Sequence, residues 1–470
     1  MKLIDNFLDK TTMYRLVLYF LLILATFGFF LQPPLYFGIS LVFLTIVSWS
    51  TNKIFSKIFK APTNLESLYI SALILALIFD PAKDFSGLIF LFEIAILTNA
   101  SKYILAIEKK HIFNPVGIAV VISGLVLNKY ATWWIASPGT IPVVLVGGLL
   151  IVHKLRRFKM VVSFFITSVL LIFIYGGSIK GFITSSPLLF FAFVMLTEPL
   201  TSPSSKLFQI VYGTIVGILF NFKGFTPELA LVSGNIFAYL VSSKDKLVLT
   251  LKQKIQVAPG IYDFIFTPNH KFNFTPGQYM EWTLAHSNPD SRGTRRFLTL
   301  ASSPTESDVR LGVKYYESSS SFKKALLNLN APIVASQLRG EFILPKDKNI
   351  KLVFVAGGIG ITPYRSMVKY LIDTNEKRDI ILIYINKTTQ EIVYKDIWDQ
   401  ANLVLGIKTI YINTSEVGHL NSQMITENIP DYKDRTWYIS GPHVMVTATG
   451  SLLKSLQIPH IKTDFFPGLV

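Results

Sequence analysis

Residues 353–367 read VFVAGGIGITPYRSM, an apolar strand that runs into a glycine-rich turn and then into a helix. Glycines at such a turn let the backbone approach a pyrophosphate, and the first turn of the helix offers free N–H groups to an anion. Further apolar strands, DIILIYIN, IKTIYI and TWYIS, follow with helical stretches between them. This alternation predicts a doubly wound parallel sheet, and we expect an α/β domain over residues 349–470.

The segment that precedes this domain has a different pattern. Short β-type runs such as KLVLTLKQKIQVA and IYDFIFTP are separated by proline and glycine turns over residues 246–346. Period-two runs of this kind predict a small antiparallel β-barrel.

Residues 1–243 are much more apolar. They hold only 18 of the 45 Lys and Arg residues and 9 of the 29 Asp and Glu residues of the chain. Mostly apolar runs, each near the length needed to cross a core of about 30 Å, begin close to positions 13, 35, 65, 87, 112, 140, 160, 182, 208 and 227. We therefore expect a multi-domain protein that begins with a polytopic α-helical membrane domain of about ten transmembrane helices.

The basic residues of this first part predict its orientation. With the N-terminus inside, 14 Lys and Arg residues fall on the cytoplasmic side and 4 on the other. The positive-inside rule then predicts a multi-pass cell-membrane protein whose N-terminus and C-terminal half are cytoplasmic. The net charge of +16 needs no nucleic acid to explain it, and the absence of cysteine excludes disulfides and cysteine-ligated clusters within this chain.

Two further motifs flank the glycine turn in a fixed order, RRFLTLASSP at 295–304 and YISGPHVM at 438–445. Together with GGIGITP at 357–363 they resemble the ferredoxin–NADP reductase superfamily, in which an FAD-binding barrel precedes a nicotinamide domain. The resemblance covers about residues 246–470. It implies a flavoprotein oxidoreductase that uses FAD and either NADH or NADPH.

The resemblance also implies roles for single residues. Arg296 matches the arginine that pairs with the FAD pyrophosphate, and Thr299 matches the hydroxyl near the flavin N5. Leu298 stands where the family commonly has an aromatic residue, and Ser440 where it often has a cysteine close to the nicotinamide. Thr299 and Ser440 are thus the implied catalytic residues.

A serine run, SSSSF at 318–322, falls where the family has a second phosphate-binding turn, although a flexible serine loop is the alternative. Asn386 and Lys387 end the second strand of the nicotinamide domain, where a lysine could accept the 2′-phosphate of NADPH. An exposed lysine is more often just solvated, so we slightly favour NADH and leave NADPH open. The implied cofactor-binding residues are Arg296, Phe297, Leu298, Thr299, Ser320, Ser321, Gly357, Gly358, Gly360, Thr362, Pro363, Gly441, Pro442 and Met445. No metal site is expected.

The membrane part has recognisable pieces of its own, IFNPVGIAVV at 112–121 and LTEPLTSPSSKLFQIVYGTIVG at 196–217. They resemble the ten-helix membrane flavin subunits of sodium-pumping NADH:quinone reductases and of Rnf-type complexes. Asn114, Thr197 and Glu198 lie in these pieces, where prolines break helices. Irregular backbone at membrane depth lines cavities or is buried, with a purely structural kink as the alternative.

Two other candidates in the membrane part, Thr132 and Glu93, each have a simpler structural interpretation beside the functional one. Those subunits hold FMN on a threonine of a Ser-Gly-Ala-Thr stretch that is absent here, and Thr132 in YATWW is the nearest substitute. A helix-end threonine beside interfacial Trp133 and Trp134 is the favoured interpretation. Glu93 within a predicted span indicates an ion or proton route, or else a paired structural glutamate.

These observations lead to one main functional hypothesis and two others. Electrons pass from cytoplasmic NAD(P)H through FAD into the membrane domain, to a membrane flavin, a quinone or an extracytoplasmic acceptor, with partner electron-transfer proteins allowed. Transmembrane haem is not expected, because only His111 and His153 of the seven histidines lie near the bilayer. The alternatives are a redox-coupled ion or small-solute transporter and a reductase with a mere membrane anchor. The sequence leaves open the terminal acceptor, the coupling to ion transport, the second flavin and the oligomeric state.

Overall fold

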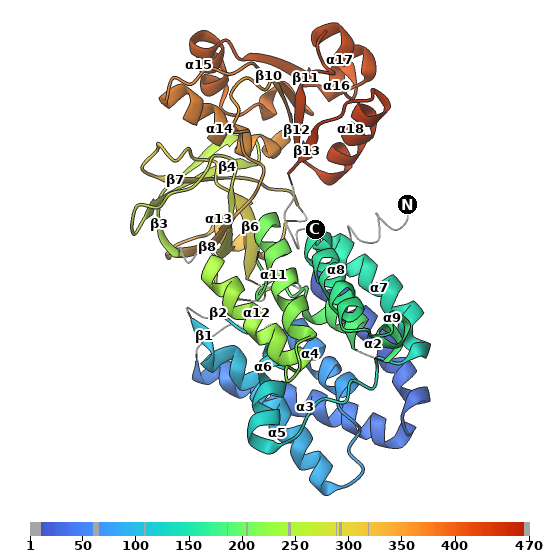
Figure 1. Ribbon diagram of the computed structural model, residues 1–470. Helices are drawn as coiled ribbons and strands as arrows, with labels where there is room; N and C mark the ends of the chain where they lie inside the picture. The colour runs from blue at the N-terminus through green and yellow to red at the C-terminus, as the bar shows by residue number, and fades with distance from the viewer. Residues whose placement is uncertain are drawn as a thin grey trace. The chain divides into compact units, whose positions relative to one another are not determined.

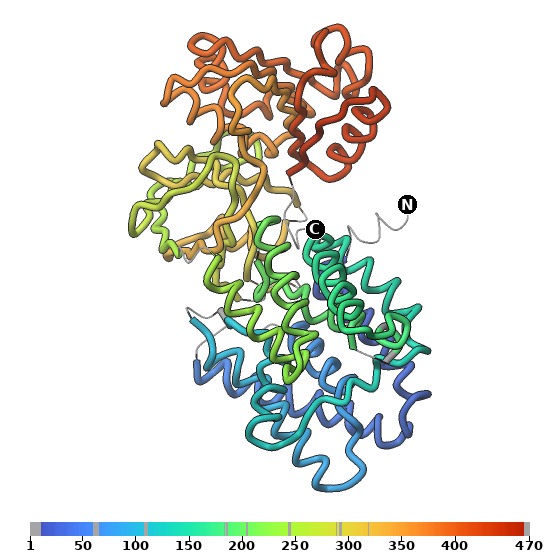
Figure 2. Tube along the Cα trace, viewed as in Figure 1, coloured from blue at the N-terminus to red at the C-terminus, as the bar shows by residue number. Residues whose placement is uncertain are grey.

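The computed structural model describes residues 11–59, 65–107, 110–185, 187–203, 205–242, 246–287, 289–290, 294–317 and 319–464. The chain divides into two compact units, Met1–Ser242 and Ser243–Phe466, which Figures 1 and 2 trace from blue to red. The sequence predicts two domains in the second unit, at residues 246–346 and 349–470, and these limits stay a prediction.

The first unit is helical and has one apolar core built from leucine, isoleucine and phenylalanine side chains. Prolines stand in the first turns of α3, α6 and α12, where the missing N–H is not needed. Its elements are α2 (Met13–Leu31), α3 (Pro34–Ile58), α4 (Leu65–Ile78), α5 (Phe85–Ile104), β1 (Ala106–Ile107), β2 (Lys110–His111), α6 (Pro115–Ile122), η1 (Ser123–Leu127), η2 (Pro138–Thr140), α7 (Ile141–Leu155), α8 (Phe158–Ile174), α9 (Ile179–Ser185), α10 (Leu188–Phe190), η3 (Phe191–Met195), α11 (Lys206–Phe220) and α12 (Pro227–Val241).

The ten membrane spans expected from hydropathy are not confirmed. Among the described residues, four helices are long and apolar enough to cross a membrane: Met13–Leu31, Pro34–Ile58, Phe85–Ile104 and Pro138–Leu155. The other apolar runs form shorter helices, such as α11 and α12 with 15 residues each. A helix of that length is only about 22 Å long, compared with a core of about 30 Å. Hydropathy located the apolar runs but could not show where each helix ends.

Both predicted helix breaks are present. Asn114 caps the start of α6 by accepting a hydrogen bond from the Gly117 N–H at 3.0 Å, and this helix continues into the π-helix η1. The π-helix η3 ends at Met195, and α11 begins only at Lys206. The described residues between them, 196–203 and 205, form turns, bends and irregular backbone.

The second unit begins with a six-stranded antiparallel sheet in the order β6-β5-β8-β3-β4-β7. The sheet is curled, and the Ala301 N–H donates to the Arg310 carbonyl at 2.9 Å, which joins the end of β6 to β7. Its core includes Trp282 and Phe264, both fully buried. Its elements are β3 (Lys246–Ala258), β4 (Ile261–Pro268), β5 (Tyr279–Thr283), β6 (Arg295–Thr299), β7 (Val309–Lys314), α13 (Ser321–Leu327) and β8 (Ile333–Arg339).

A five-stranded parallel sheet follows, in the order β11-β10-β9-β12-β13. Alternate residues of β9 face two separate cores: Leu352 and Phe354 pack toward α14 and α15, and Val353 and Val355 toward α17 and α18. Helices therefore cover both faces, as Figure 1 shows in orange and red. The elements are β9 (Leu352–Gly357), η4 (Gly358–Ile361), α14 (Thr362–Asp373), β10 (Ile380–Asn386), η5 (Thr389–Glu391), α15 (Lys395–Leu405), β11 (Lys408–Asn413), α16 (Thr414–Val417), α17 (Ser422–Asn428), β12 (Thr436–Ser440), α18 (His443–Ser455) and β13 (Ile461–Thr463).

Candidate functional site: a nicotinamide cradle and a flavin strand

The order of the parallel strands places the glycine-rich turn at a switch point. After β9 the chain builds β10 and β11 on one side, and β12 and β13 lie on the other. Crevices at the carboxyl ends of strands at such a point are where doubly wound sheets bind nucleotides. The doubly wound sheet and the location of the turn were both predicted from the sequence.

The glycines of the turn divide into two groups. A Cβ on Gly360 would lie 2.5 Å from the Gly441 Cα, and one on Gly441 would lie 3.1 Å from the Gly357 Cα. These three glycines therefore let the ends of β9 and β12 pack backbone to backbone. Gly358 is different, because it has a φ of +51° and no atom within 4 Å of the Cβ position. This open face of the turn is where a phosphate can approach the backbone.

We call the glycine-rich turn at 357–363, together with residues 440–445, the nicotinamide cradle. Its other predicted residues support its shape. Thr362 begins α14 and donates its hydroxyl to the Ile359 carbonyl at 3.2 Å, and Pro363 stands in the first turn. Met445 and Pro442 contact the face that a Cβ on Gly357 would need. Asn386 is buried and Lys387 is exposed at the end of β10.

Ser440 ends β12 and is 3% exposed. Its hydroxyl donates to the Asp464 Oδ2 at 3.1 Å, and the Asp464 N–H donates to the Ile439 carbonyl at 3.0 Å. The sequence singled out Ser440 but missed Asp464. A carboxylate that accepts from the serine hydroxyl orients this group at the cradle.

Arg296 lies on β6 and is 6% exposed. Its Nη2 contacts both carboxylate oxygens of Asp290, at 2.8 and 2.9 Å. The same carboxylate accepts from the Ser321 N–H at 3.2 Å, and the Ser321 hydroxyl accepts from the Asp290 N–H at 2.9 Å. An anionic group is thus already seated between Arg296 and the predicted serine turn.

The serines of that turn have separate duties. Ser320 caps α13 by accepting from the Lys323 N–H at 3.4 Å. The Ser321 hydroxyl also lies 3.1 Å from Nε2 of His286, whose Nδ1 lies 2.9 Å from the Leu284 carbonyl. Because that carbonyl can only accept, Nδ1 carries a proton, and in the neutral tautomer Nε2 accepts from Ser321. Asp290 and His286 gave no sequence signal beyond their place ahead of Arg296.

The remaining predicted flavin-binding residues lie along β6. We call residues 296–299 of this strand the flavin strand, after their predicted role. The Phe297 ring meets the Tyr279 ring edge to face, with 5.7 Å between centroids. The Leu298 side chain is half-buried, and its carbonyl accepts from the Trp282 indole at 3.1 Å. Thr299 is 8% exposed at the end of the strand, opposite Tyr279.

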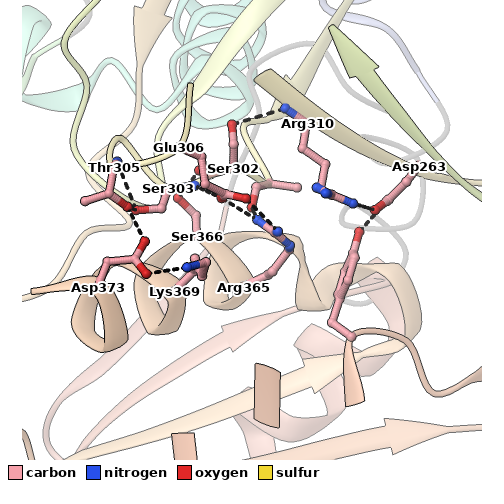
Figure 3. A network of polar contacts seen from close by, with 12 residues as sticks. Asp263, Ser302, Ser303, Thr305, Glu306, Arg310, Arg365, Ser366, Lys369 and Asp373 are labelled. Atoms are coloured by element: carbon pink, nitrogen blue, oxygen red, sulfur yellow. Dashed lines mark hydrogen bonds and ion pairs between the residues drawn. The ribbon is translucent and has the colours of Figure 1, made fainter. Parts of the chain in front are cut away.

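A polar network joins this strand to the cradle helix, and Figure 3 shows it closely. Arg365 of α14 donates to the Ala301 carbonyl at 2.7 Å, and the Ser366 hydroxyl donates to the Ser302 carbonyl at 2.6 Å. The flavin strand and the nicotinamide cradle are therefore held together a few residues from Thr299 and Gly360.

In the helical unit, the two predicted motifs meet through a residue that the sequence did not single out. Asn235 of α12 accepts from the Asn114 N–H at 2.8 Å and donates to the Thr201 carbonyl at 3.0 Å. Glu198 accepts from the Thr201 hydroxyl at 3.1 Å and lies 3.2 Å from His111. Both motifs thus belong to one polar cluster, in which Asn114, Thr201 and Asn235 are buried and Glu198 is partly exposed.

The other candidates of the helical unit have different contacts. The Thr197 hydroxyl donates to the Phe193 carbonyl at 2.8 Å, one turn back. Thr132 is exposed, and its hydroxyl contacts the Ile78 carbonyl and Asp80 at 3.1 and 3.2 Å. Glu93 is half-buried on α5.

One expectation for this unit is wrong. Trp133 does not lie at a surface, because it is 8% exposed and donates to the buried Glu228 at 2.7 Å. The neighbouring Trp134 donates to the Phe79 carbonyl at 2.9 Å. Buried hydrogen-bond acceptors draw these indoles inward, which hydropathy alone could not show.

Comparisons with known proteins agree with the geometry of the second unit. Residues 354–450 match the family model described as the oxidoreductase NAD-binding domain. The chain is 23% identical over 224 residues to a flavohemoprotein of Oceanobacillus iheyensis, which covers 44% of this chain and 55% of that protein. It is 23% identical over 215 residues to the NADH oxidoreductase HCR of Escherichia coli, and this match covers 45% of this chain and 65% of that protein.

A solved structure is also similar. The FAD/NAD-binding domain of a nitric oxide dioxygenase from Vibrio cholerae superposes with a TM-score of 0.41 at 18% identity, over 47% of this chain and 99% of that one. The sequence matches span only about half to two thirds of the curated relatives. The family model and the relatives indicate an oxidoreductase that depends on FAD and a nicotinamide cofactor.

The residues present fit these two groups. Gly358 offers an open backbone face for a nucleotide phosphate. Arg296 and the Ser321 N–H bind the carboxylate of Asp290, so these donors suit an anionic group such as a pyrophosphate.

Proposed function

We propose that the protein is a membrane-bound, flavin-dependent NAD(P)H oxidoreductase that passes electrons from cytoplasmic NAD(P)H into its helical unit. The observation that carries this proposal is the joining of two segments, the Arg296–Thr299 strand and the cradle that begins at Gly357, through hydrogen bonds from α14. The two cofactor sites implied by the family are thereby fixed next to each other in one compact unit.

The roles of the residues follow from their surroundings. Arg296, Ser320 and Ser321 hold the FAD pyrophosphate, and Gly358 with the start of α14 holds the nicotinamide dinucleotide. Thr299 ends β6 and would face the flavin, and Ser440, which is oriented by Asp464, ends β12 and would face the nicotinamide. FAD, when bound, supplies the acceptor for the hydride and divides the electron pair for later carriers.

The acceptor in the helical unit is a flavin or a quinone. Cysteine is absent from the chain, so this chain cannot build a cysteine-ligated relay. The resemblance of residues 112–121 and 196–217 to Rnf-type and sodium-pumping reductase subunits supports a bound membrane flavin. Crossing about 30 Å of hydrocarbon requires such a second cofactor.

Flavin identity and number in the purified full-length protein test this proposal. Two reducible flavins for each chain, with quinone reduction driven by NADH or NADPH, are expected. A single flavin for each chain would contradict transfer across the membrane and restrict the activity to the cytoplasmic face.

A second candidate function is redox-coupled transport of an ion or a small solute. The cluster of Asn114, Glu198 and Asn235 favours it, because buried polar groups between broken helices are typical of transport sites. Ion flux into sealed vesicles that depends on NADH oxidation would establish this function. Oxidation without flux would exclude it.

A further inference from the structure

The contact between the flavin strand and the cradle helix is built as a fork. Arg365 Nη1 donates to the Ala301 carbonyl at 2.7 Å and to Glu306 Oε2 at 2.8 Å, and Nη2 donates to Glu306 Oε1 at 2.9 Å. The Ser366 hydroxyl adds a bond of 2.6 Å to the Ser302 carbonyl. We call Arg365, Ser366, Ala301, Ser302 and Glu306 the Arg365 clamp. In Figure 3 the guanidinium points from α14 toward Glu306.

The Arg365 clamp is buried and fixed from both sides. The Arg365 side chain is 4% exposed, and Ser302 and Ser366 are 1% and 0% exposed. Glu306 is itself held by the Ser303 N–H at 2.7 Å. A planar fork between fixed acceptors allows little rotation or sliding of α14 against the strand.

Charge strengthens the same contact. Burial alone would raise the pKa of the Glu306 carboxyl, but the Arg365 guanidinium, the Ser303 N–H and the charge of Arg310 lower it below its ordinary value. Burial lowers the pKa of Arg365, and the Glu306 carboxylate more than offsets this effect. Both groups are therefore charged, and their bonds are charge-assisted.

A second contact lies beside the Arg365 clamp. The Asp263 carboxylate, 0% exposed, accepts from Tyr394 at 2.5 Å and from Arg310 at 2.6 Å. A Cβ on Gly312 of β7 would lie 2.8 Å from the Tyr394 hydroxyl and 2.9 Å from Thr362. The strand β7 thus packs directly on the start of the cradle helix.

The position of the clamp gives it a consequence for chemistry. Ala301 lies two residues after Thr299, and Arg365 lies five residues after Gly360. Any movement at the clamp is passed through short, buried segments to both predicted cofactor contacts. Hydride transfer needs reacting atoms within about 3.5 Å, and a misplacement of about 1 Å can cost a factor of about 100.

We propose that Arg365 is a positioning residue for hydride transfer, which acts through Ala301 and Glu306 to fix the flavin strand against the nicotinamide cradle. This inference rests on the proposed function. It adds a role for a residue whose Nη1 and Nη2 groups donate to protein acceptors.

The test compares two arginines with similar bonding. Arg435 is 6% exposed and donates to Asp431 at 2.7 Å and to Asp379 at 2.7 and 3.2 Å. It also contacts the carbonyl of Leu352 at the start of β9. This is the amino end of the strand, whereas the cradle lies at the carboxyl end. Arg435→Lys is therefore the matched control for Arg365→Lys, since lysine keeps the charge and loses the fork in both places.

The full-length protein loaded with FAD is mixed anaerobically with NADH, and flavin reduction is followed in a single turnover. Flavin content, nicotinamide affinity and the long-wavelength absorbance of the flavin–nicotinamide pair are measured in the same samples. For Arg365→Lys we expect reduction to slow by about 10 to 100 times and the long-wavelength absorbance to fall, with FAD content unchanged. Arg435→Lys is expected to reduce at the wild-type rate, and Glu306→Gln to behave like Arg365→Lys.

An unchanged rate in Arg365→Lys would overturn the proposal, as would equal slowing in Arg435→Lys. Loss of FAD from Arg365→Lys alone would also overturn it, because the residue would then retain the flavin. If Arg365→Lys does not fold, Glu306→Gln decides by the same criteria. Failure of wild-type protein to bind FAD or to be reduced would instead refute the proposed function.

Discussion

Two of the buried arginines of the second unit, Arg296 and Arg365, form nearly the same pair with a carboxylate. Their side chains are 6% and 4% exposed, and those of their partners, Asp290 and Glu306, are 27% and 22% exposed. The difference lies in what each carboxylate joins. Asp290 bonds Ser321 at the predicted phosphate turn, whereas Glu306 joins the loop that follows β6 to α14. We therefore propose that the same chemistry serves ligand binding in one place and positioning in the other.

The largest expected effect breaks the first pair. Arg296→Ala removes the proposed partner of the pyrophosphate, and we expect the dissociation constant for FAD to rise about 100-fold, because a buried charge partner is lost. Flavin fluorescence during titration of the full-length protein measures it. Arg295→Ala is the control, since the Arg295 side chain is 34% exposed and its Nη1 lies 3.5 Å from Glu281 Oε1. Equal weakening in both variants would contradict the assignment.

Removing the carboxylate from each pair sharpens the comparison. Asp290→Ala and Glu306→Ala each leave a buried guanidinium without its carboxylate, which costs about 3 kcal/mol in the free energy of unfolding. Added FAD should restore the melting temperature of Asp290→Ala to that of wild-type protein with FAD, because the pyrophosphate replaces the lost anion, whereas Glu306→Ala should stay below it. Melting curves with and without FAD measure this difference. Restoration of both variants, or of neither, would show that the two pairs do not differ in role.

The smallest expected effect concerns pH. The pKa of Glu306 is lowered in the folded protein, mainly because Arg365 outweighs the cost of burial. Its contribution to stability is therefore complete above the ordinary pKa of a glutamate and is lost as the pH falls through the lowered value. Unfolding of Glu306→Gln should lack this acid-side loss, as denaturant titrations across that range can measure. An identical pH dependence in the wild type and the variant would contradict the charged pair.

The sequence predicted the chemistry of the second unit better than the connections within it. The glycine turn, Arg296 and Ser440 were located because each lies in a local motif in a fixed order. Arg365 and Glu306 stood inside or beside those motifs, but their pairing spans 59 residues and depends on how β7 and α14 pack. Asp464 was missed for the same reason, since its contact with Ser440 arises only when β13 joins the sheet.

In the helical unit the sequence located apolar runs and helix breaks, but not their partners. Asn235 was missed because an asparagine in an apolar run gives no sign that it bonds both Asn114 and Thr201. Trp133 was misassigned because its acceptor, Glu228, lies 95 residues away. Side-chain pairing at such distances follows from packing and not from local pattern.

The proposal that NADH reduces FAD bound to this chain is tested most directly by an anaerobic titration. The purified full-length protein is titrated with NADH, and flavin absorbance is read. We expect the bound flavins to be bleached by about one NADH for each flavin, and Arg296→Ala to retain much less FAD to bleach. A wild-type protein that binds FAD but keeps its oxidised spectrum in excess NADH and NADPH would contradict the account.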